Sequence, residues 1–216
     1  EFASIPILFQ SAAVTDASVV PTAYVFVAPF STNTTAENND LAFETITRSE
    51  FTVFNTQWAT VRDPRVPWDT VRTTSGALAV GQDGRTTFFR QRKYATLAAD
   101  IPIVKGTEML LLRAEAALRN NDVAGAVTLI NQVRAFHNTT SAPLPALTGI
   151  TTAAQAWPVL QKERGATLWL EGRRLWDLRR WNAETGPAKN SYLDTRDKCI
   201  PISLNETQSN PNLRGT

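Results

Sequence analysis

The sequence has one cysteine, Cys199, and one histidine, His137, among its 216 residues. A single cysteine excludes an internal disulfide, and the two residues together are too few for a metal site built on thiolate and imidazole ligands. The chain has no run of about 18 apolar residues, so we expect no transmembrane helix. Its 22 basic and 20 acidic residues leave a formal net charge of +2, which weighs against a nucleic-acid partner. We therefore expect a globular chain without a cofactor and without a metal site built on cysteine or histidine; whether it has a calcium site is left open.

Sequence patterns for catalysis are also scarce, and we expect no enzyme. No G-x-S-x-G, P-loop or G-x-G-x-x-G motif is present. His137 falls at the C-terminal end of a predicted helix, where a dipole or solvent contact is the usual role. Glu163 and Glu171 would lie about 12 Å apart along a helix, beyond the roughly 5 to 9.5 Å that paired glycosidase carboxylates need. A carbohydrate-active enzyme is kept only as an alternative, to be tested by glycan turnover.

The chain changes character near residue 100, and we divide it there. Residues 1–100 hold short β-like runs, AYVFVAPF and FTVFNTQW, between stretches rich in Ser, Thr, Asn and Gly. We expect a loop-rich segment with a few short strands and one short helix, in ENNDLAFETITRSEF. Residues 101–216 have helical periodicity and end in an extended tail. The predicted fold class is mainly α, with a loop-rich segment carrying a few short strands.

Two helices, Thr107–Arg119 and Val123–Phe136, are predicted to form a tetratricopeptide-like hairpin. Thr107 would cap the first helix and Asp122 the second, and the short loop makes them antiparallel. Each helix has one apolar stripe at three-to-four spacing, made of positions 110, 111, 114, 117 and 118 and positions 123, 127, 130, 133 and 136. Further helices are expected at about 153–169 and 172–181. Because proline is tolerated only in a first turn, Pro158 predicts that the regular helix begins near Trp157.

The stretch LWLEGRRLWDLRRWN, residues 168–182, combines tryptophans with arginines and acids. It could clamp nucleic acid, with Arg173, Arg174, Arg179 and Arg180 beside Trp176 and Trp181. The favoured interpretation is a helix that ion pairs hold in the fold, with Glu171 and Asp177 pairing to nearby arginines. In that case four side chains point to a core, those of Leu168, Leu175, Trp176 and Leu178. The residues assigned a structural role are Glu163, Arg164, Glu171, Arg173, Asp177 and Arg180.

The order of several motifs resembles a known family. EMLLLRAEAALRNND and AVTLINQVR are followed by ERGATLWLEGRRLWDLRRW and then by CIPISLNETQSNPNL. Over roughly residues 101–213 this order is similar to the C-terminal half of SusD/RagB-like proteins. The chain departs from the family at Thr167, where an acidic residue is usual, and at Lys105, where an arginine commonly precedes the helix.

The resemblance implies a SusD-like α/α superhelix, present here in part, and a non-catalytic nutrient-binding protein. Family members are surface-exposed lipoproteins of the outer membrane that bind oligosaccharides or peptides. They act as the lid of a SusC-like TonB-dependent barrel transporter. The implied lipid anchor would lie upstream, outside this chain, which we expect to be part of a longer protein. The alternative is a helical-repeat module for protein–protein interaction with no transport role.

The ligand surface is predicted in the loop-rich part, because binding residues concentrate on loops above a rigid scaffold. In TQWATVRDPRVPWDTVR the tryptophans at 58 and 68 lie where no helical stripe requires them. Exposed rings of this kind stack on sugars, and polar side chains contact the sugar edges. The predicted ligand contacts are Trp58, Trp68, Arg62, Asp63 and Arg65. In the alternative, both rings anchor the loops to the helical core.

Overall fold

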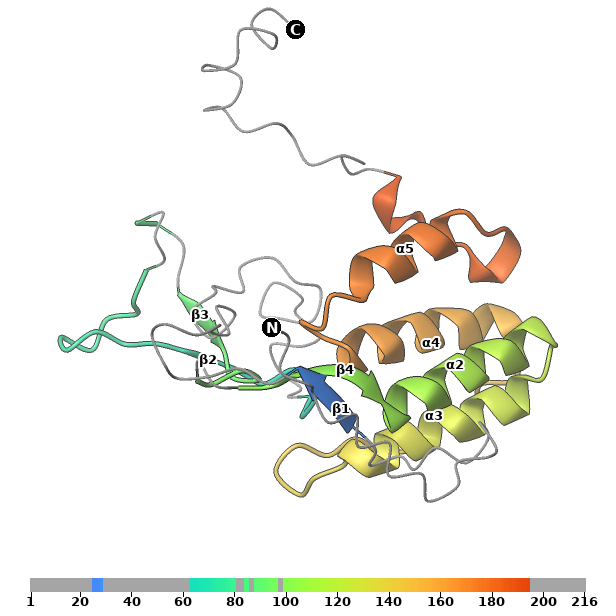
Figure 1. Ribbon diagram of the computed structural model, residues 1–216, viewed down its shortest axis with the longest axis horizontal. Coiled ribbons are helices and arrows are strands. Elements are labelled where there is room, and N and C mark those ends of the chain that lie inside the picture. Colours follow the sequence, from blue (N-terminus) through green and yellow to red (C-terminus); the bar gives the residue numbers. More distant parts are fainter. Residues whose placement is uncertain (1–24, 29–62, 81–83, 86–87, 97–98, 195–216) are drawn as a thin grey trace, which may run out of the picture. The chain divides into compact units, whose positions relative to one another are not determined.

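The computed structural model describes residues 25–28, 63–80, 84–85, 88–96 and 99–194 (Figure 1). The chain divides into two compact units, residues 1–174 and 175–216, which are treated separately below. The described elements are mostly helical with a few short strands, which confirms the predicted fold class. The predicted division at residue 100 stays a prediction. One strand from before residue 100 nevertheless pairs with one from after it, as shown below.

Helices α2, Gly106–Arg119, and α3, Val123–His137, form the predicted hairpin. They pack along each other, and Ile130 of α3 is completely buried (Figure 1). Asp122 caps α3 as predicted, since its carboxylate accepts a hydrogen bond from the amide of Gly125 at 2.8 Å. The predicted cap at Thr107 is wrong. Strand β4 runs directly into α2, so Lys105 is the N-cap residue and Thr107 lies buried inside the first turn.

Helix α4 spans Ala153–Thr167 and packs against both α2 and α3. The side chain of Thr152 accepts from the amide of Gln155, whose own side chain accepts from the amide of Thr152. This capping box sets the helix start well before Pro158, so the predicted start near Trp157 is wrong. Pro158 and Ala154 are both exposed. Pro158 has no amide to donate to the carbonyl of Ala154, and the exposure of both residues places this missing hydrogen bond on the solvent side of the helix.

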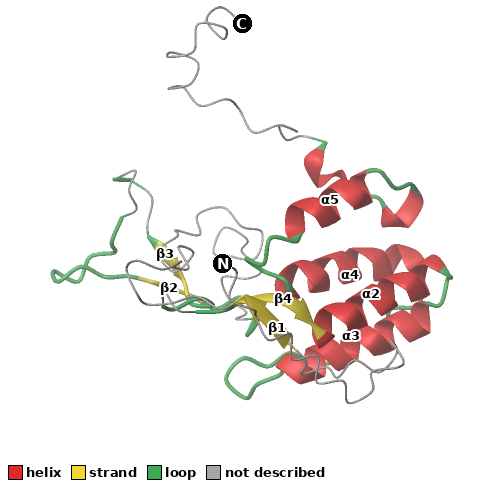
Figure 2. Cartoon of the chain, viewed as in Figure 1, coloured by secondary structure: helices red, strands yellow, loops and turns green. Residues whose placement is uncertain are grey.

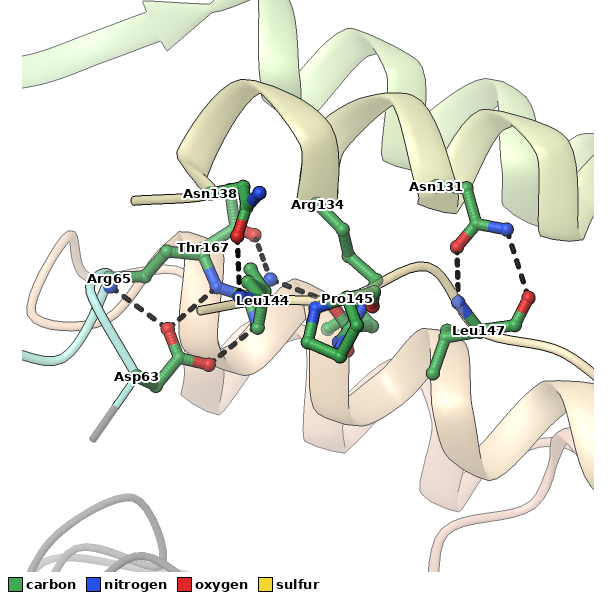
Figure 3. Close-up of polar contacts among 10 residues, drawn as sticks. Asp63, Arg65, Asn131, Arg134, Asn138, Leu144, Pro145, Leu147 and Thr167 are labelled. Atoms are coloured by element: carbon green, nitrogen blue, oxygen red, sulfur yellow. Dashed lines mark hydrogen bonds and ion pairs between the residues drawn. The ribbon is translucent and has the colours of Figure 1, made fainter. Parts of the chain in front are cut away.

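Polar side chains of α3 hold the proline-rich connector that leads to α4 (Figure 3). The amide side chain of Asn131 both donates to and accepts from the backbone of Leu147, at 3.1 and 2.8 Å. One turn further on, Arg134 Nε donates to the carbonyl of Pro145 at 2.7 Å. These bonds pair three backbone groups of a segment that has no secondary structure and tie it to α3.

The strands form two separate antiparallel pairs (Figure 2). Strand β1, Val25–Ala28, pairs with β4, Ile101–Lys105, and β2, Trp68–Thr70, pairs with β3, Phe89–Gln91. The run AYVFVAPF therefore contains a strand, as predicted. Residues 101–105 form strand β4, so in the described part after residue 100 the first helix begins at Gly106 rather than at residue 101. The predicted strand FTVFNTQW and the predicted helix in ENNDLAFETITRSEF lie outside the described residues.

The second unit begins at the second residue of α5, Arg174–Asn182, and continues through two short 3₁₀ turns, η3, Gly186–Ala188, and η4, Ser191–Leu193. Its buried positions are Asp177, Leu178 and Trp181, which share one side of the helix. Trp176 lies on the opposite side and is 65% exposed, and Leu175 is 45% exposed. The prediction that these two point to a core is therefore wrong, since the buried stripe of this short helix is narrow.

Candidate functional site

A chain of buried charges joins the loop before β2 to helices α3 and α4 (Figure 3). The guanidinium of Arg65 donates to both carboxylate oxygens of Asp63, at 2.9 and 2.7 Å, and to Glu163 Oε2 at 2.6 Å. The other oxygen of Glu163 accepts from Arg134 Nη1 at 2.5 Å. All four residues are at most 9% exposed. Two cations and two anions therefore compensate each other inside the fold.

The pKa values at one end of this chain reflect the pairing. Burial acts to raise the pKa of Asp63, but the hydrogen bonds and charge of Arg65 outweigh it and leave that pKa below its usual value. Burial likewise acts to lower the pKa of Arg65, and its two carboxylate partners raise it above the usual value. Both side chains therefore stay charged at neutral pH, locked to one another.

A second cluster of charged side chains lies at the C-terminal end of α4. Lys93 and Lys105 both donate to Oε1 of Glu171, at 2.5 and 2.6 Å. Lys93 also donates to the carbonyl of Trp169, and Lys105 donates to that of Thr167. Cations are favourable where helix carbonyls have no helical partner. The two lysines thus cap the end of α4 and neutralise a carboxylate that is 2% exposed.

Burial lowers the pKa of Lys93 to about 8, and the positive charge of Lys105 adds to this, while Glu171 opposes it. Burial also raises the pKa of the Tyr94 hydroxyl, with a further contribution from Glu171. That hydroxyl donates to the carbonyl of Leu170 at 3.3 Å. Tyr94 is therefore a neutral donor at the end of α4.

The remaining residues predicted as structural also make ion pairs. Arg164 donates to Glu108 Oε1 at 3.1 Å, and Arg173 Nε lies 3.6 Å from the same oxygen. In the second unit Arg180 lies 3.1 Å from Asp177, three residues earlier on α5. Among the described residues, Glu171 pairs with Lys93 and Lys105 and not, as predicted, with a neighbouring arginine.

His137 is the last residue of α3, and its Nε2 atom is buried without a hydrogen-bond partner among the described residues. Burial lowers its pKa to about 4, and the positive charges of Arg65 and Lys105 contribute. A neutral imidazole next to cations is a poor general base at neutral pH. The structure therefore places the sole histidine in a packing position.

The β2–β3 pair has one face toward the core and one toward solvent. Trp68 stands opposite Gln91, and the side chain of Gln91 is fixed by two hydrogen bonds to the backbone of Tyr94. Trp68 packs against the buried cluster of Val66, Ala166 and Trp169. Because side chains alternate along a strand, the next position in each strand points the other way.

The solvent face carries Asp69 and Arg90, directly opposite each other, and Arg92 just beyond β3. Arg90 forms a two-pronged contact with the Asp69 carboxylate, at 3.0 and 2.8 Å, and Arg92 Nε lies 3.6 Å from it. Hydrogen bonding to Asp69 raises the pKa of Arg90 above its usual value. The sequence analysis did not select these three residues. The alternation in WDT and RQR was the signal available, but only with the strand pairing known.

The predicted ligand residues thus have different placements. Trp58 and Arg62 lie outside the described residues. Trp68 is half-buried against the core, as the alternative interpretation required. The side chains of Asp63 and Arg65 are each 1% exposed and are paired with each other. Such burial argues against ligand contacts by Asp63 and Arg65, and we assign both to the scaffold.

Other classes of site have no candidate in the described part of the chain. There, no group of three or more histidine, cysteine, aspartate or glutamate side chains is arranged to hold a metal ion. None of the described helices has the length and apolar character needed to span a bilayer. What the described residues offer is a helical scaffold tied by buried ion pairs, with a charged strand face open to solvent.

Comparison with known proteins identifies the family of this chain. Residues 85–199 match the SusD family, and the chain belongs to that family. A crystal structure of a SusD-like protein from Bacteroides fragilis NCTC 9343 is similar, with 25% identity and a TM-score of 0.39. The match covers 55% of this chain and 26% of that one, so the chain spans about a quarter of that protein's length. No curated protein matches the chain.

Proposed function

We propose that this chain is part of a non-catalytic protein that captures an oligosaccharide at the outer-membrane surface and delivers it to a SusC-like TonB-dependent transporter. The observation that carries the proposal is the SusD match over residues 85–199. Proteins of this family are in general nutrient-binding proteins that work with such transporters. The membrane link would be an N-terminal lipid anchor outside this chain.

The contacts of Glu163 and Glu171 argue against a catalytic role for these two carboxylates. Glu163 is engaged by two arginines and Glu171 by two lysines, all within the fold. Neither carboxylate is accessible to a substrate, and a buried charge that lost its partners would be strongly destabilised. Acid–base chemistry on a glycan needs a carboxyl group within hydrogen-bond reach of the scissile bond.

The ligand surface in this proposal lies within residues 1–100. Trp58 is the candidate aromatic platform, because Trp68 packs against the core. Truncation of a stacked aromatic anchor is expected to weaken binding by more than about 1 kcal/mol. Trp68→Ala should instead lower stability, through loss of packing against Trp169.

The test is calorimetric titration of a glycan panel against the chain and against Trp58→Ala, with chromatography of each glycan after incubation. The expected result is saturable binding of at least one oligosaccharide whose length is unchanged afterwards. Co-purification of a barrel transporter from outer membranes with the native protein tests the delivery step. Absence of glycan binding, or appearance of shortened products, would contradict the proposal.

A further inference from the structure

The solvent face of the β2–β3 pair holds more positive than negative charge. Among the described residues Asp69 is the one acid on this face, and two guanidinium groups, those of Arg90 and Arg92, lie within 4 Å of it. The three side chains are 39%, 39% and 47% exposed, in the order Asp69, Arg90 and Arg92. A single carboxylate cannot neutralise both cations, so one positive charge is left facing water.

The surrounding segment has the same bias. Residues 63–96 contain six basic and three acidic residues, a surplus of three positive charges. Asp63 and Arg65 pair with each other in the interior, and Lys93 pairs with Glu171, so four arginines and two aspartates remain, a surplus of two positive charges. Arg72 is also exposed on this hairpin, where its guanidinium donates to the carbonyl of Gly76. An anion that approaches the hairpin therefore meets a positive potential.

The strand pairing orders the Arg90 side chain and the backbone of Arg92. Arg90 is held by its two hydrogen bonds to Asp69, and the amide of Arg92 donates to the carbonyl of Pro67 at 2.8 Å. The opposite face of the strand pair is anchored through Gln91, which is 1% exposed. The Arg90 side chain and the Arg92 backbone are therefore ordered before a ligand binds, and they lose little entropy on binding.

The Arg92 guanidinium has N–H donors that are available to a ligand. Within the described ranges its guanidinium has no hydrogen bond and one ion pair, at 3.6 Å from Asp69, which is too long for a good hydrogen bond. A guanidinium presents a planar fork of N–H groups that matches the two oxygens of a carboxylate or the oxygens of a sulfate. Sugar hydroxyls can accept single hydrogen bonds, but they do not match the charge.

We propose that this face binds the acidic group, carboxylate or sulfate, of an acidic oligosaccharide, with Arg92 in direct contact and the Asp69–Arg90 pair positioning it. The inference rests on the proposed function and names its ligand class. The acidic group would make charge-assisted hydrogen bonds to Arg92, and neighbouring sugar hydroxyls would donate to Asp69. A neutral glycan would gain only the weaker contacts.

The experiment compares matched acidic and neutral ligands by calorimetry on the full chain. The probes are oligogalacturonate, its methyl ester, and sulfated and unsulfated galactan oligosaccharides of equal length. The variant Arg92→Gln removes the proposed contact. The control Arg113→Gln removes the same charge from an exposed position on α2, and circular dichroism checks that both variants are folded.

We expect the wild-type chain to bind a carboxylated or a sulfated probe at least about tenfold more tightly than its neutral counterpart, as loss of a charge-assisted contact implies. Arg92→Gln should remove that preference and the salt dependence of binding, and Arg113→Gln should keep both. The probe preferred, carboxylated or sulfated, identifies the acidic group.

Equal binding of acidic and neutral forms, or an unchanged preference in Arg92→Gln, would overturn the inference and leave the proposed function standing. If no oligosaccharide binds in either form, the proposed function fails as well. The two failures are therefore distinguishable from one set of titrations.

Discussion

Glu163→Gln tests the buried charge chain that ties the β2 loop to α3 and α4. The Glu163 side chain is 3% exposed and lies between Arg65 and Arg134. Glutamine has nearly the same shape and keeps one acceptor oxygen. Its other terminal atom becomes an NH₂ group that faces a guanidinium, so one hydrogen bond is lost together with the negative charge.

The expected loss of unfolding free energy depends on which ion-pair partners Arg65 and Arg134 keep in the variant. At an effective dielectric constant of about 20, two unit charges 4 Å apart interact by roughly 4 kcal/mol. Arg65 keeps Asp63 as a partner, but Arg134, with its side chain 11% exposed, loses its ion pair. Part of the loss is returned, because the carboxylate no longer has to be desolvated. We expect destabilisation of about 3 to 5 kcal/mol, typical of breaking a buried pair from one side.

Urea unfolding followed by far-ultraviolet circular dichroism measures this free energy. For a chain of this size the loss corresponds to a fall in Tm of roughly 6 to 20 °C. The control is Asp194→Asn, which alters an exposed pair with Lys189 at 3.8 Å and should cost no more than about 1 kcal/mol. A cost for Glu163→Gln no larger than that of the control would refute the reasoning.

Ile130→Ala should cost about 2 to 5 kcal/mol in urea unfolding, because Ile130 is fully buried between helices, whereas Leu112→Ala, at a position 40% exposed, should cost much less. Between pH 8 and 10.5 the unfolded state binds more protons than the folded state at Lys93, so stability relative to Lys93→Met should rise with pH, by up to roughly 3 kcal/mol. Between about pH 4 and 6.5 the unfolded state also binds more protons than the folded state at His137, so stability relative to His137→Gln should rise with pH. If the difference in unfolding free energy between the two proteins did not change over this range, the lowered pKa of His137 would be contradicted. Asp177→Asn should lower the Tm and leave glycan affinity nearly unchanged, and selective loss of binding would instead indicate a ligand contact on α5.

The sequence by itself determined the helical hairpin and the family. Apolar spacing over residues 106–137 and the cap at Asp122 are local signals, because helix hydrogen bonds and capping contacts join residues only a few positions apart. The order of the motifs from residue 108 onward identified the SusD-like character, because motif order is a property of the sequence and needs no knowledge of the tertiary contacts. Where a local signal was overridden, as at Thr107, a neighbouring element had fixed the helix start instead.

Only the tertiary structure decided which charges meet and which faces are buried. The partner of Glu163 on the β2 side, Arg65, is 98 residues away, and Lys93 lies 78 residues from Glu171. Nearby arginines gave no reliable guide, because ion pairs that stay in water contribute little and a buried carboxylate is paired by whichever cations the packing brings to it. The same holds for Trp68 and Asp69, adjacent residues on opposite faces of β2. Strand pairing and the core beneath it determine which of the two faces solvent.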